Sequence, residues 1–108
     1  MPSSRRLRLS PEADDDIAAI ARYSAETWGS QQMAAYVDRL YATLDELVHF
    51  PGIGRVRDEI APGLRSHPTG QHVAFYRVTD DELIVVRVVH SRRDAETALR
   101  SHAPRSFE

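Results

Sequence analysis

Apolar residues change their spacing along the first part of the chain. Leu7 and Leu9 alternate with arginines, which predicts a short strand over residues 6–9. Ser10 and Pro11 then indicate a helix start, because serine caps the free N–H groups of a first turn and proline fits the first helical position. The apolar residues that follow have helical spacing, as on one face of a helix, and they are Ala13, Ile17, Ile20, Ala21 and Trp28.

A second helix follows after a joint of two residues. Gly29 interrupts the first helix, and Ser30 is expected to be the N-cap of the next one. Pro51-Gly52 closes the second helix, whose apolar stripe comprises Met33, Val37, Leu40, Leu44, Leu47 and Val48. So short a joint forces the two helices into an antiparallel hairpin, with each arm on the order of 25 Å long.

Strand patterns dominate the second half of the chain. After a loop from Pro51 to Gly63, a short strand is expected over residues 64–67, a longer one over 72–78 and the strongest over 83–89. Residues 79–82 form the turn that makes the last two strands a β-hairpin. The element order is β-α-α-β-β-β. It predicts an α+β fold in which the helical hairpin packs on one face of a small, mostly antiparallel sheet.

The last two strands are apolar on both faces. If residue 78 pairs with residue 83, one face presents Val73, Phe75, Arg77, Ile84, Val86 and Val88, and the other presents His72, Ala74, Tyr76, Val78, Leu83, Val85, Arg87 and Val89. One helical hairpin covers only one face, and four or five apolar side chains left in water forgo roughly 1.5–3 kcal/mol each. The alternative cover, the loop 51–63 with the tail 95–108, is inadequate because the tail is mostly small and polar. The sequence therefore predicts a partner on the second face.

Composition and charge narrow the class of protein. The 108 residues are expected to form one domain over 1–108, with a C-terminal tail over 95–108 that can be flexible. No cysteine is present, and no apolar run approaches the roughly 20 residues that span a bilayer, so a cytoplasmic protein is expected. The net charge is −2, and the arginines from Arg87 to Arg105 are too few for a dedicated DNA-binding surface. We therefore expect protein partners, without a membrane and without sequence-specific contact to nucleic acid.

Few side chains indicate metal binding. Residues 14–16 are three aspartates, but successive helical residues point about 100° apart, so a solvated first turn is expected rather than a metal cluster. His67 and His72 lack a third ligand at a convincing spacing, which argues against a metal site. Arg87 lies within an apolar strand, where it needs a carboxylate partner or access to the sheet edge, and the sequence does not identify that partner.

Binding is the role expected at the end of the last strand and on the second helix. His90 stands beside Arg92 and Arg93, and a histidine without a carboxylate to orient it more often binds than catalyses. Tyr23 of the first helix and Tyr36 and Tyr41 of the second are of a type that more often packs helices together, but any of them that stays exposed is suited to anchor a partner. No catalytic residue is expected.

Ordered motifs along the chain resemble the ParE toxins of the RelE/ParE superfamily. These motifs are Leu9-Ser10-Pro11-Glu12-Ala13 with Asp15, Trp28-Gly29, Tyr36, Pro51-Gly52-Ile53-Gly54-Arg55, Gly63-Leu64-Arg65-Ser66, His72-Val73-Ala74-Phe75-Tyr76-Arg77-Val78 and Arg87-Val88-Val89-His90-Ser91-Arg92. The resemblance runs from Leu7 to Asp94 and implies the same β-α-α-β-β-β fold. It also implies the toxin component of a type II toxin–antitoxin system, which binds DNA gyrase so that cleaved DNA complexes persist, without chemistry of its own and without a cofactor.

An antitoxin is the partner that this resemblance implies. A ParD-like antitoxin would have a ribbon-helix-helix N-terminus, and its dimer would bridge two toxins in a heterotetramer or a larger complex. Its extended C-terminal segment would cover the open sheet face and the helices, at Val73, Phe75, Arg77, Ile84, Val86, Val88, Tyr36 and Tyr41. The candidates for contact with gyrase are His90, Arg92 and Arg93.

Two other functions stay open. A ribosome-dependent mRNA endonuclease of RelE type would place cations at positions that correspond to Ala61, Gly63 and Val73. Its terminal tyrosine would fall near Leu99, and only Arg93 keeps a matching charge, so the chain is poorly equipped to cleave RNA. The other function is that of a degenerate toxin, which binds its antitoxin and has no target.

Overall fold

The computed structural model describes residues 5–93, so the tail expected over residues 95–108 lies outside the described part of the chain. In chain order the elements are β1 (Arg6–Leu9), α1 (Pro11–Trp28), α2 (Ser30–His49), the 3₁₀ helix η1 (Pro51–Ile53), β2 (Arg55–Val56), β3 (Arg65–Thr69), β4 (His72–Val78) and β5 (Glu82–His90). The predicted order of one strand, two helices and three strands is confirmed. The loop after α2 adds η1 and the short strand β2, which the sequence did not predict.

Ser10 begins the helical hairpin and ties it to the sheet. Its Oγ accepts a hydrogen bond from the N–H of Ala13 at 3.0 Å, as an N-cap does, and donates one to the carbonyl of Val86 at 2.7 Å. At the joint between the helices the cap is Gly29, whose φ of +93° favours glycine. Ser30 is already the first residue of α2, so its prediction as N-cap is wrong by one position.

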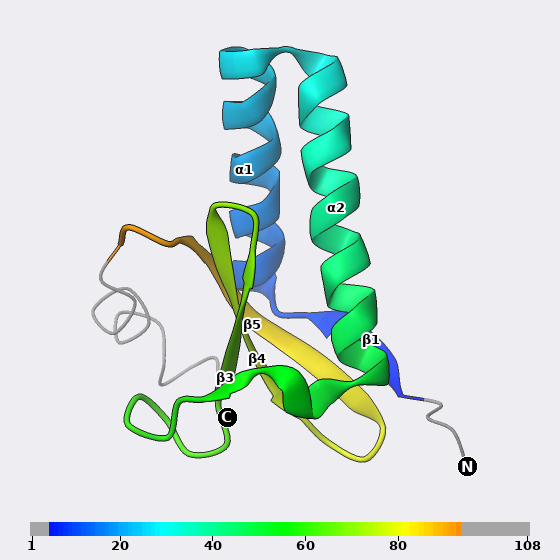
Figure 1. Cartoon of the computed structure of the whole chain (residues 1–108), viewed down its shortest axis with the longest axis vertical. Helices are drawn as coiled ribbons and strands as arrows, with labels where there is room; N and C mark the ends of the chain where they lie inside the picture. Colours follow the sequence, from blue (N-terminus) through cyan, green and yellow to red (C-terminus); the bar gives the residue numbers. More distant parts are fainter. Residues whose placement is uncertain (1–4, 94–108) are drawn as a thin grey trace.

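One sheet of five strands carries both helices on the same face (Figure 1). The strand order is β1-β5-β4-β3-β2; β1 is parallel to β5, and the other neighbours are antiparallel. The α+β prediction, with its mostly antiparallel sheet, is confirmed. α1 and α2 lie side by side, and their joined ends project beyond the sheet (Figure 1). Within residues 5–93 no helix has the length and the apolar character needed to cross a membrane.

Two apolar clusters fill the two faces of the sheet. The helix-side cluster consists of Ala13, Ile17, Ile20, Leu40, Leu44, Leu47, Val48, Ala74, Tyr76, Leu83, Val85 and Val88. The second cluster consists of Ala61, Leu64, Phe75, Val86 and Val89, with Ile60 and Val73 packed against it. The face that the sequence predicted to be open is therefore largely covered by the chain itself, and both Phe75 and Val86 are fully buried.

The cover over the second face is the segment of residues 57–64. It turns back on itself, because the N–H of Arg57 donates to the carbonyl of Leu64 at 2.8 Å and the N–H of Gly63 donates to Asp58 Oδ1 at 2.9 Å. The guanidinium of Arg57 also lies 5.5 Å from the ring centre of Phe75, within reach of a cation–π interaction. The prediction that only a partner could shelter this face is wrong, because the loop folds into a compact turn that adds apolar side chains of its own.

A β-bulge changes which face each residue of β5 occupies. The predicted pairing of Val78 with Leu83 is confirmed, but Phe75 lies opposite Arg87 while its neighbour in β4 lies opposite Val85. The extra residue in β5 shifts the alternation of side chains beyond it. Val88 therefore packs in the helix-side cluster, whereas the sequence placed it on the open face. Val89 packs in the second cluster, which is again the opposite of the prediction.

Candidate binding cleft

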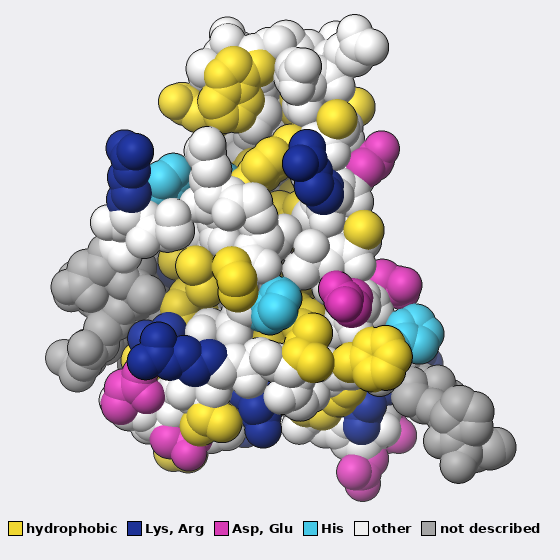
Figure 2. All heavy atoms as spheres, in the orientation of Figure 1, with side chains coloured by type: hydrophobic (Ala, Val, Ile, Leu, Met, Phe, Trp, Pro, Cys, Tyr) yellow, Lys and Arg dark blue, Asp and Glu magenta, His cyan; other side chains and the backbone are white. Residues whose placement is uncertain are grey.

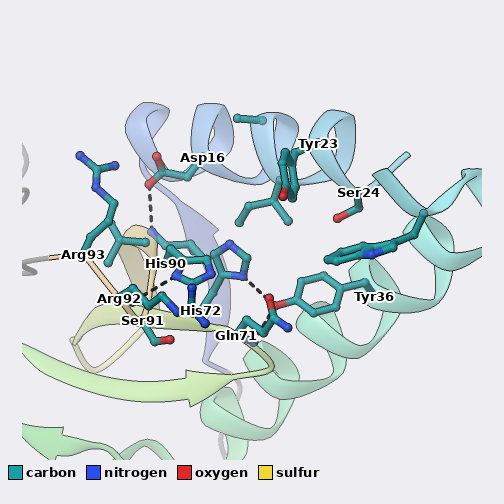
Figure 3. A pocket seen from close by; sticks show the side chains of 15 residues that line it. Asp16, Tyr23, Ser24, Tyr36, Gln71, His72, His90, Ser91, Arg92 and Arg93 are labelled. Atoms are coloured by element: carbon teal, nitrogen blue, oxygen red, sulfur yellow. Dashed lines mark hydrogen bonds between the residues drawn. The ribbon is translucent and has the colours of Figure 1, made fainter. Parts of the chain in front are cut away.

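A cleft of about 600 Å³ lies where the projecting half of the helical hairpin meets the ends of β4 and β5. Its walls are formed by α1 on one side, by the first half of α2 on another, and by residues 71–72 and 88–93 of the strands and their ends (Figure 3). In the space-filling view, apolar side chains gather at the projecting end of the hairpin, and arginines stand apart from them on the same face (Figure 2). The cleft therefore combines an apolar wall with a basic rim.

Two aromatic side chains of α1 form the apolar wall. Tyr23 is 61% exposed and Trp28 is 49% exposed. Their rings contact each other edge to face, with the centroids 6.0 Å apart. The sequence placed Trp28 on the buried stripe of the first helix, and this is wrong because the end of α1 extends past the sheet, where Trp28 stays half exposed. The buried residue of that turn is Ser24.

The floor of the cleft contains two histidines on neighbouring strands. His72 and His90 are cross-strand partners, and their ring centroids lie 5.2 Å apart. His72 Nδ1 lies 2.6 Å from Tyr36 Oη, which also accepts a hydrogen bond from the N–H of Gln71 at 2.8 Å. The N–H of Arg92 donates to His90 Nδ1 at 3.1 Å. These contacts hold both rings in place, and the contact with Arg92 uses Nδ1 of His90 as its acceptor.

The pKa of His72 reflects this partly buried position. Burial lowers the pKa of its imidazole below the ordinary value, and the neighbouring His90 lowers it further. The carboxylate of Asp16 acts in the opposite direction but does not reverse the result. His72 is therefore neutral over a wider pH range than an exposed histidine.

Charge on the rim of the cleft is positive. Arg92 and Arg93 are exposed and line the cleft at the end of β5. Asp16 is the one carboxylate among the described lining residues, and its oxygens bind the guanidinium of Arg87 at 2.7 and 3.0 Å. The expectation that residues 14–16 are all solvated is thus wrong for Asp16, which is the carboxylate partner that the sequence could not identify for Arg87.

The structure brings the candidate residues for gyrase contact together and disperses those for the antitoxin. His90, Arg92 and Arg93 line one cleft, and Tyr36 from the antitoxin set lines it too. Trp28, Gln71 and His72 line the cleft although none of them was a binding candidate, whereas Tyr23 is one of the tyrosines that were expected to anchor a partner if they stay exposed. For Trp28 the sequence contained a signal, because the polar residue Ser24 interrupts the apolar stripe just before the last turn of α1.

The remaining antitoxin candidates occupy three environments. Val73, Phe75 and Val86 belong to the second cluster, and Val88 belongs to the helix-side cluster. Arg77 and Ile84 are cross-strand partners on the second face, where both are half-buried, and Tyr41 is exposed on α2. They do not form the single open surface that the sequence predicted. Within residues 5–93 no three histidine, aspartate or glutamate side chains converge as a metal site would require.

Comparisons with known proteins place these features in one family. A sequence model described as the ParE toxin of the type II toxin–antitoxin system parDE matches residues 7–95. The toxin ParE1 of Caulobacter vibrioides is 36% identical over 92 residues, which cover 85% of this chain and 95% of that protein. The toxin ParE of Escherichia coli is 30% identical over 92 residues, which cover 84% and 89%. A solved structure titled as a chromosomal ParDE TA system from P. aeruginosa matches with a TM-score of 0.70 at 20% identity, over 81% of this chain and 96% of that one, and so shares the fold.

Proposed function

The chain belongs to the ParE toxin family of type II toxin–antitoxin systems, and we propose that it inhibits DNA gyrase by binding and performs no chemistry of its own. The observation that carries the proposal is the family match over residues 7–95, together with relatives named as ParE toxins that align over nearly their whole length. The toxin would act in the cytoplasm, on gyrase that has cleaved its DNA, so that the cleaved complexes persist.

The hydrogen bonds of the cleft support a binding role. A general base needs an accessible lone pair at the site of reaction. The Nδ1 lone pair of His90 already accepts the N–H of Arg92, and His72 Nδ1 lies against the hydroxyl of Tyr36. The carboxylate of Asp16 binds Arg87 and the N–H of Val88. The carboxylate of Asp16 and the Nδ1 atoms of His72 and His90 thus take part in contacts that fix the shape of the cleft. The proposed contacts for gyrase are His90, Arg92 and Arg93.

Neutralisation would come from a ParD-like antitoxin. Its ribbon-helix-helix N-terminus would form a dimer that bridges two toxins, in a heterotetramer or a larger complex. Its C-terminal segment would bind the accessible candidates, which are Tyr36, Tyr41, Arg77 and Ile84. Contact with Phe75, or with the other candidates in the two buried clusters, would require the segment of residues 57–64 or the helices to move.

A supercoiling assay with purified gyrase tests the proposal. The chain at micromolar concentration should inhibit supercoiling or cause cleaved DNA to accumulate, and the cognate antitoxin should reverse the effect. Unchanged gyrase activity in the presence of folded toxin would contradict the proposal. Primer extension on mRNA after induction provides the opposing test, because cuts positioned by codons would assign the chain to the ribosome-dependent nucleases.

A further inference from the structure

We propose that the cleft beside α1 binds an acidic, extended peptide segment of the target protein, with one large apolar side chain of that segment against Tyr23 and Trp28 and its carboxylates on Arg92 and Arg93. This inference rests on the proposed function for the identity of the partner. Beyond that function, it specifies which side chains the bound segment of the target must have.

The shape of the cleft fits a peptide better than a small molecule. A second hollow of about 480 Å³ adjoins the cleft, and the two share Trp28, Tyr36 and Gln71. Together they form a groove from the end of β5 to the first half of α2, where Gln32 and Arg39 line the second hollow. The volume of the cleft lies within the roughly 300–1,000 Å³ of ordinary ligand sites, so it has room for a large apolar side chain. An extended segment can fill the cleft with one side chain and continue into the adjoining hollow.

The apolar wall explains why the occupant needs a large apolar side chain. Tyr23 and Trp28 expose more than a third of their surface although they contact each other edge to face. Rigid exposed aromatic rings of this kind contribute much of the energy at protein interfaces, because they bury a large area with little loss of conformational entropy. Tyr36 stiffens the opposite wall through its contacts with Gln71 and His72. The wall is therefore already formed before a partner arrives.

The charges of the groove select an acidic partner. Arg92 and Arg93 are exposed at one end, and Arg39 is exposed along the adjoining hollow. The charge of Asp16 is balanced by Arg87, so no carboxylate in the described lining competes for these three arginines. Arginine binds carboxylates through two parallel hydrogen bonds, which gives such a contact direction as well as charge.

A nucleic acid is the weaker fit for the same groove. A surface that binds nucleic acid depends on a dense field of positive charge, since most of its affinity comes from phosphate contacts. This chain carries 16 acidic residues against 14 basic ones, for a net charge of −2. Three arginines along one groove suit a few carboxylates better than a phosphate backbone.

The single tryptophan of the chain makes the groove directly measurable. Trp28 lines both hollows, so its fluorescence reports on their occupation. The probe is an acetylated peptide of about nine residues with one central phenylalanine between glutamates, and it lacks tryptophan. The full chain should show a saturable change of Trp28 emission with this peptide. A peptide with alanine at the centre, or with lysines for the glutamates, should bind at least about tenfold more weakly, which corresponds to about 1.4 kcal/mol.

Charge reversal on the rim is the matched variant test. Replacing both rim arginines, Arg92→Glu with Arg93→Glu, should weaken the acidic peptide at least about tenfold, because attraction becomes repulsion while the exposed positions leave the fold intact. Arg55→Glu is the control, since Arg55 is exposed on β2 and does not line the groove. Equal binding of the glutamate and lysine peptides, unchanged binding by the rim variant, or tighter binding of oligodeoxythymidine would each overturn the proposal.

The same variants separate this inference from the proposed function. The rim variant should lose inhibition of gyrase and keep its affinity for the antitoxin, and Arg55→Glu should keep both. If the unmodified chain leaves gyrase unaffected, the proposed function fails, and the target is not the source of the segment. If the unmodified chain and the rim variant inhibit gyrase equally, the proposed function stands and this inference fails. Loss of antitoxin binding with retained inhibition would assign the groove to the antitoxin and also overturn it.

Discussion

Asp16 and Arg87 form a two-point ion pair that joins α1 to β5, with Arg87 Nε 2.7 Å from Asp16 Oδ2 and Nη2 3.0 Å from Oδ1. The same Oδ2 accepts the N–H of Val88 at 2.9 Å. The side chains of Arg87 and Asp16 are largely buried, at 8% and 16% exposure respectively. The hydrogen bonds to Asp16 raise the pKa of the Arg87 guanidinium above its ordinary value, although burial acts against them. The pair thus fixes the helical hairpin to the strand beside the cleft.

Removing one member of this pair should lower the free energy of unfolding much more than removing an exposed carboxylate of the same turn. Asp16→Ala removes the carboxylate that binds the buried guanidinium of Arg87 at two points, which should cost about 3–5 kcal/mol of unfolding free energy. Asp15→Ala is the matched control, because Asp15 is exposed on the same turn, and it should change stability by less than about 0.5 kcal/mol. Urea denaturation measures both variants. Equal, small losses in the two would mean that the ion pair contributes little.

A double substitution separates the missing charge from other effects at the site. Replacing both partners by apolar residues, Asp16→Leu with Arg87→Met, removes the buried charge as well as its counter-charge. The double variant should therefore be more stable than Asp16→Leu alone. A double variant that is as unstable as the sum of the two single ones would show that the two residues act independently.

The self-covered second face should make Phe75 essential to the isolated chain. Phe75→Ala leaves a cavity in the second cluster and should cost about 3–5 kcal/mol without any partner present. Phe50→Ala makes the same chemical change at a side chain that is 62% exposed, so its cost should stay within about 0.5 kcal/mol. Thermal or urea unfolding of the purified toxin gives both values. A small effect of Phe75→Ala on the isolated chain would mean that this face is open in solution and awaits a partner.

The sequence predicted the elements well because each carries its own local signal. The strand pattern at Leu7 and Leu9, the cap at Ser10 and the breaks at Gly29 and Pro51 all act over a few residues. These signals are enough to give the order of the elements. The layering follows, since two helices joined by one glycine can cover only one side of a sheet.

What the sequence did not predict depends on contacts between distant residues. The bulge opposite Phe75 exchanges the faces of Val88 and Val89. The alternation of residues within one strand cannot predict such a bulge, because the bulge depends on how β4 and β5 pair. The cover of residues 57–64 and the partner of Arg87 likewise arise only when the chain is folded. The cleft was predicted in part, because His90, Arg92 and Arg93 were candidates and Tyr23 was an expected anchor if exposed, while Trp28 was assigned to the core.

The hydroxyl of Tyr36 should hold the turn between β3 and β4 against α2. It accepts the N–H of Gln71 at 2.8 Å, lies 2.6 Å from His72 Nδ1 and donates toward the carbonyl of Thr69 at 3.3 Å. Gly70 adopts a φ of +62° beneath it, and a Cβ there would meet Tyr36 Oη. Tyr36→Phe leaves these partly buried groups without their partner, so it should cost about 1–3 kcal/mol.

Hydrogen exchange tells this role apart from a general loss of stability. In Tyr36→Phe the amide of Gln71 should exchange much faster than in the unmodified chain, while amides in the middle of β5 keep their protection. Tyr41→Phe, on the exposed side of α2, serves as the control and should alter neither stability nor exchange. Unchanged protection of the Gln71 amide in Tyr36→Phe would show that the hydroxyl is dispensable.

Acid should weaken the fold through His72. Burial, and then the neighbouring His90, lower the pKa of His72 from its ordinary value of 6.5 in the folded chain, while the unfolded chain keeps that value. As the pH falls below about 6.5, the unfolded chain takes up a proton that the folded chain does not, so the free energy of unfolding decreases until the lower folded pKa is reached. Denaturant midpoints measured from about pH 7 to about pH 5 should therefore decline, and His72→Gln should flatten that decline. His49→Gln is the matched control for the substitution itself, because it removes an exposed imidazole that does not line the cleft. An identical slope in the unmodified chain and in His72→Gln would place the acid sensitivity in another group.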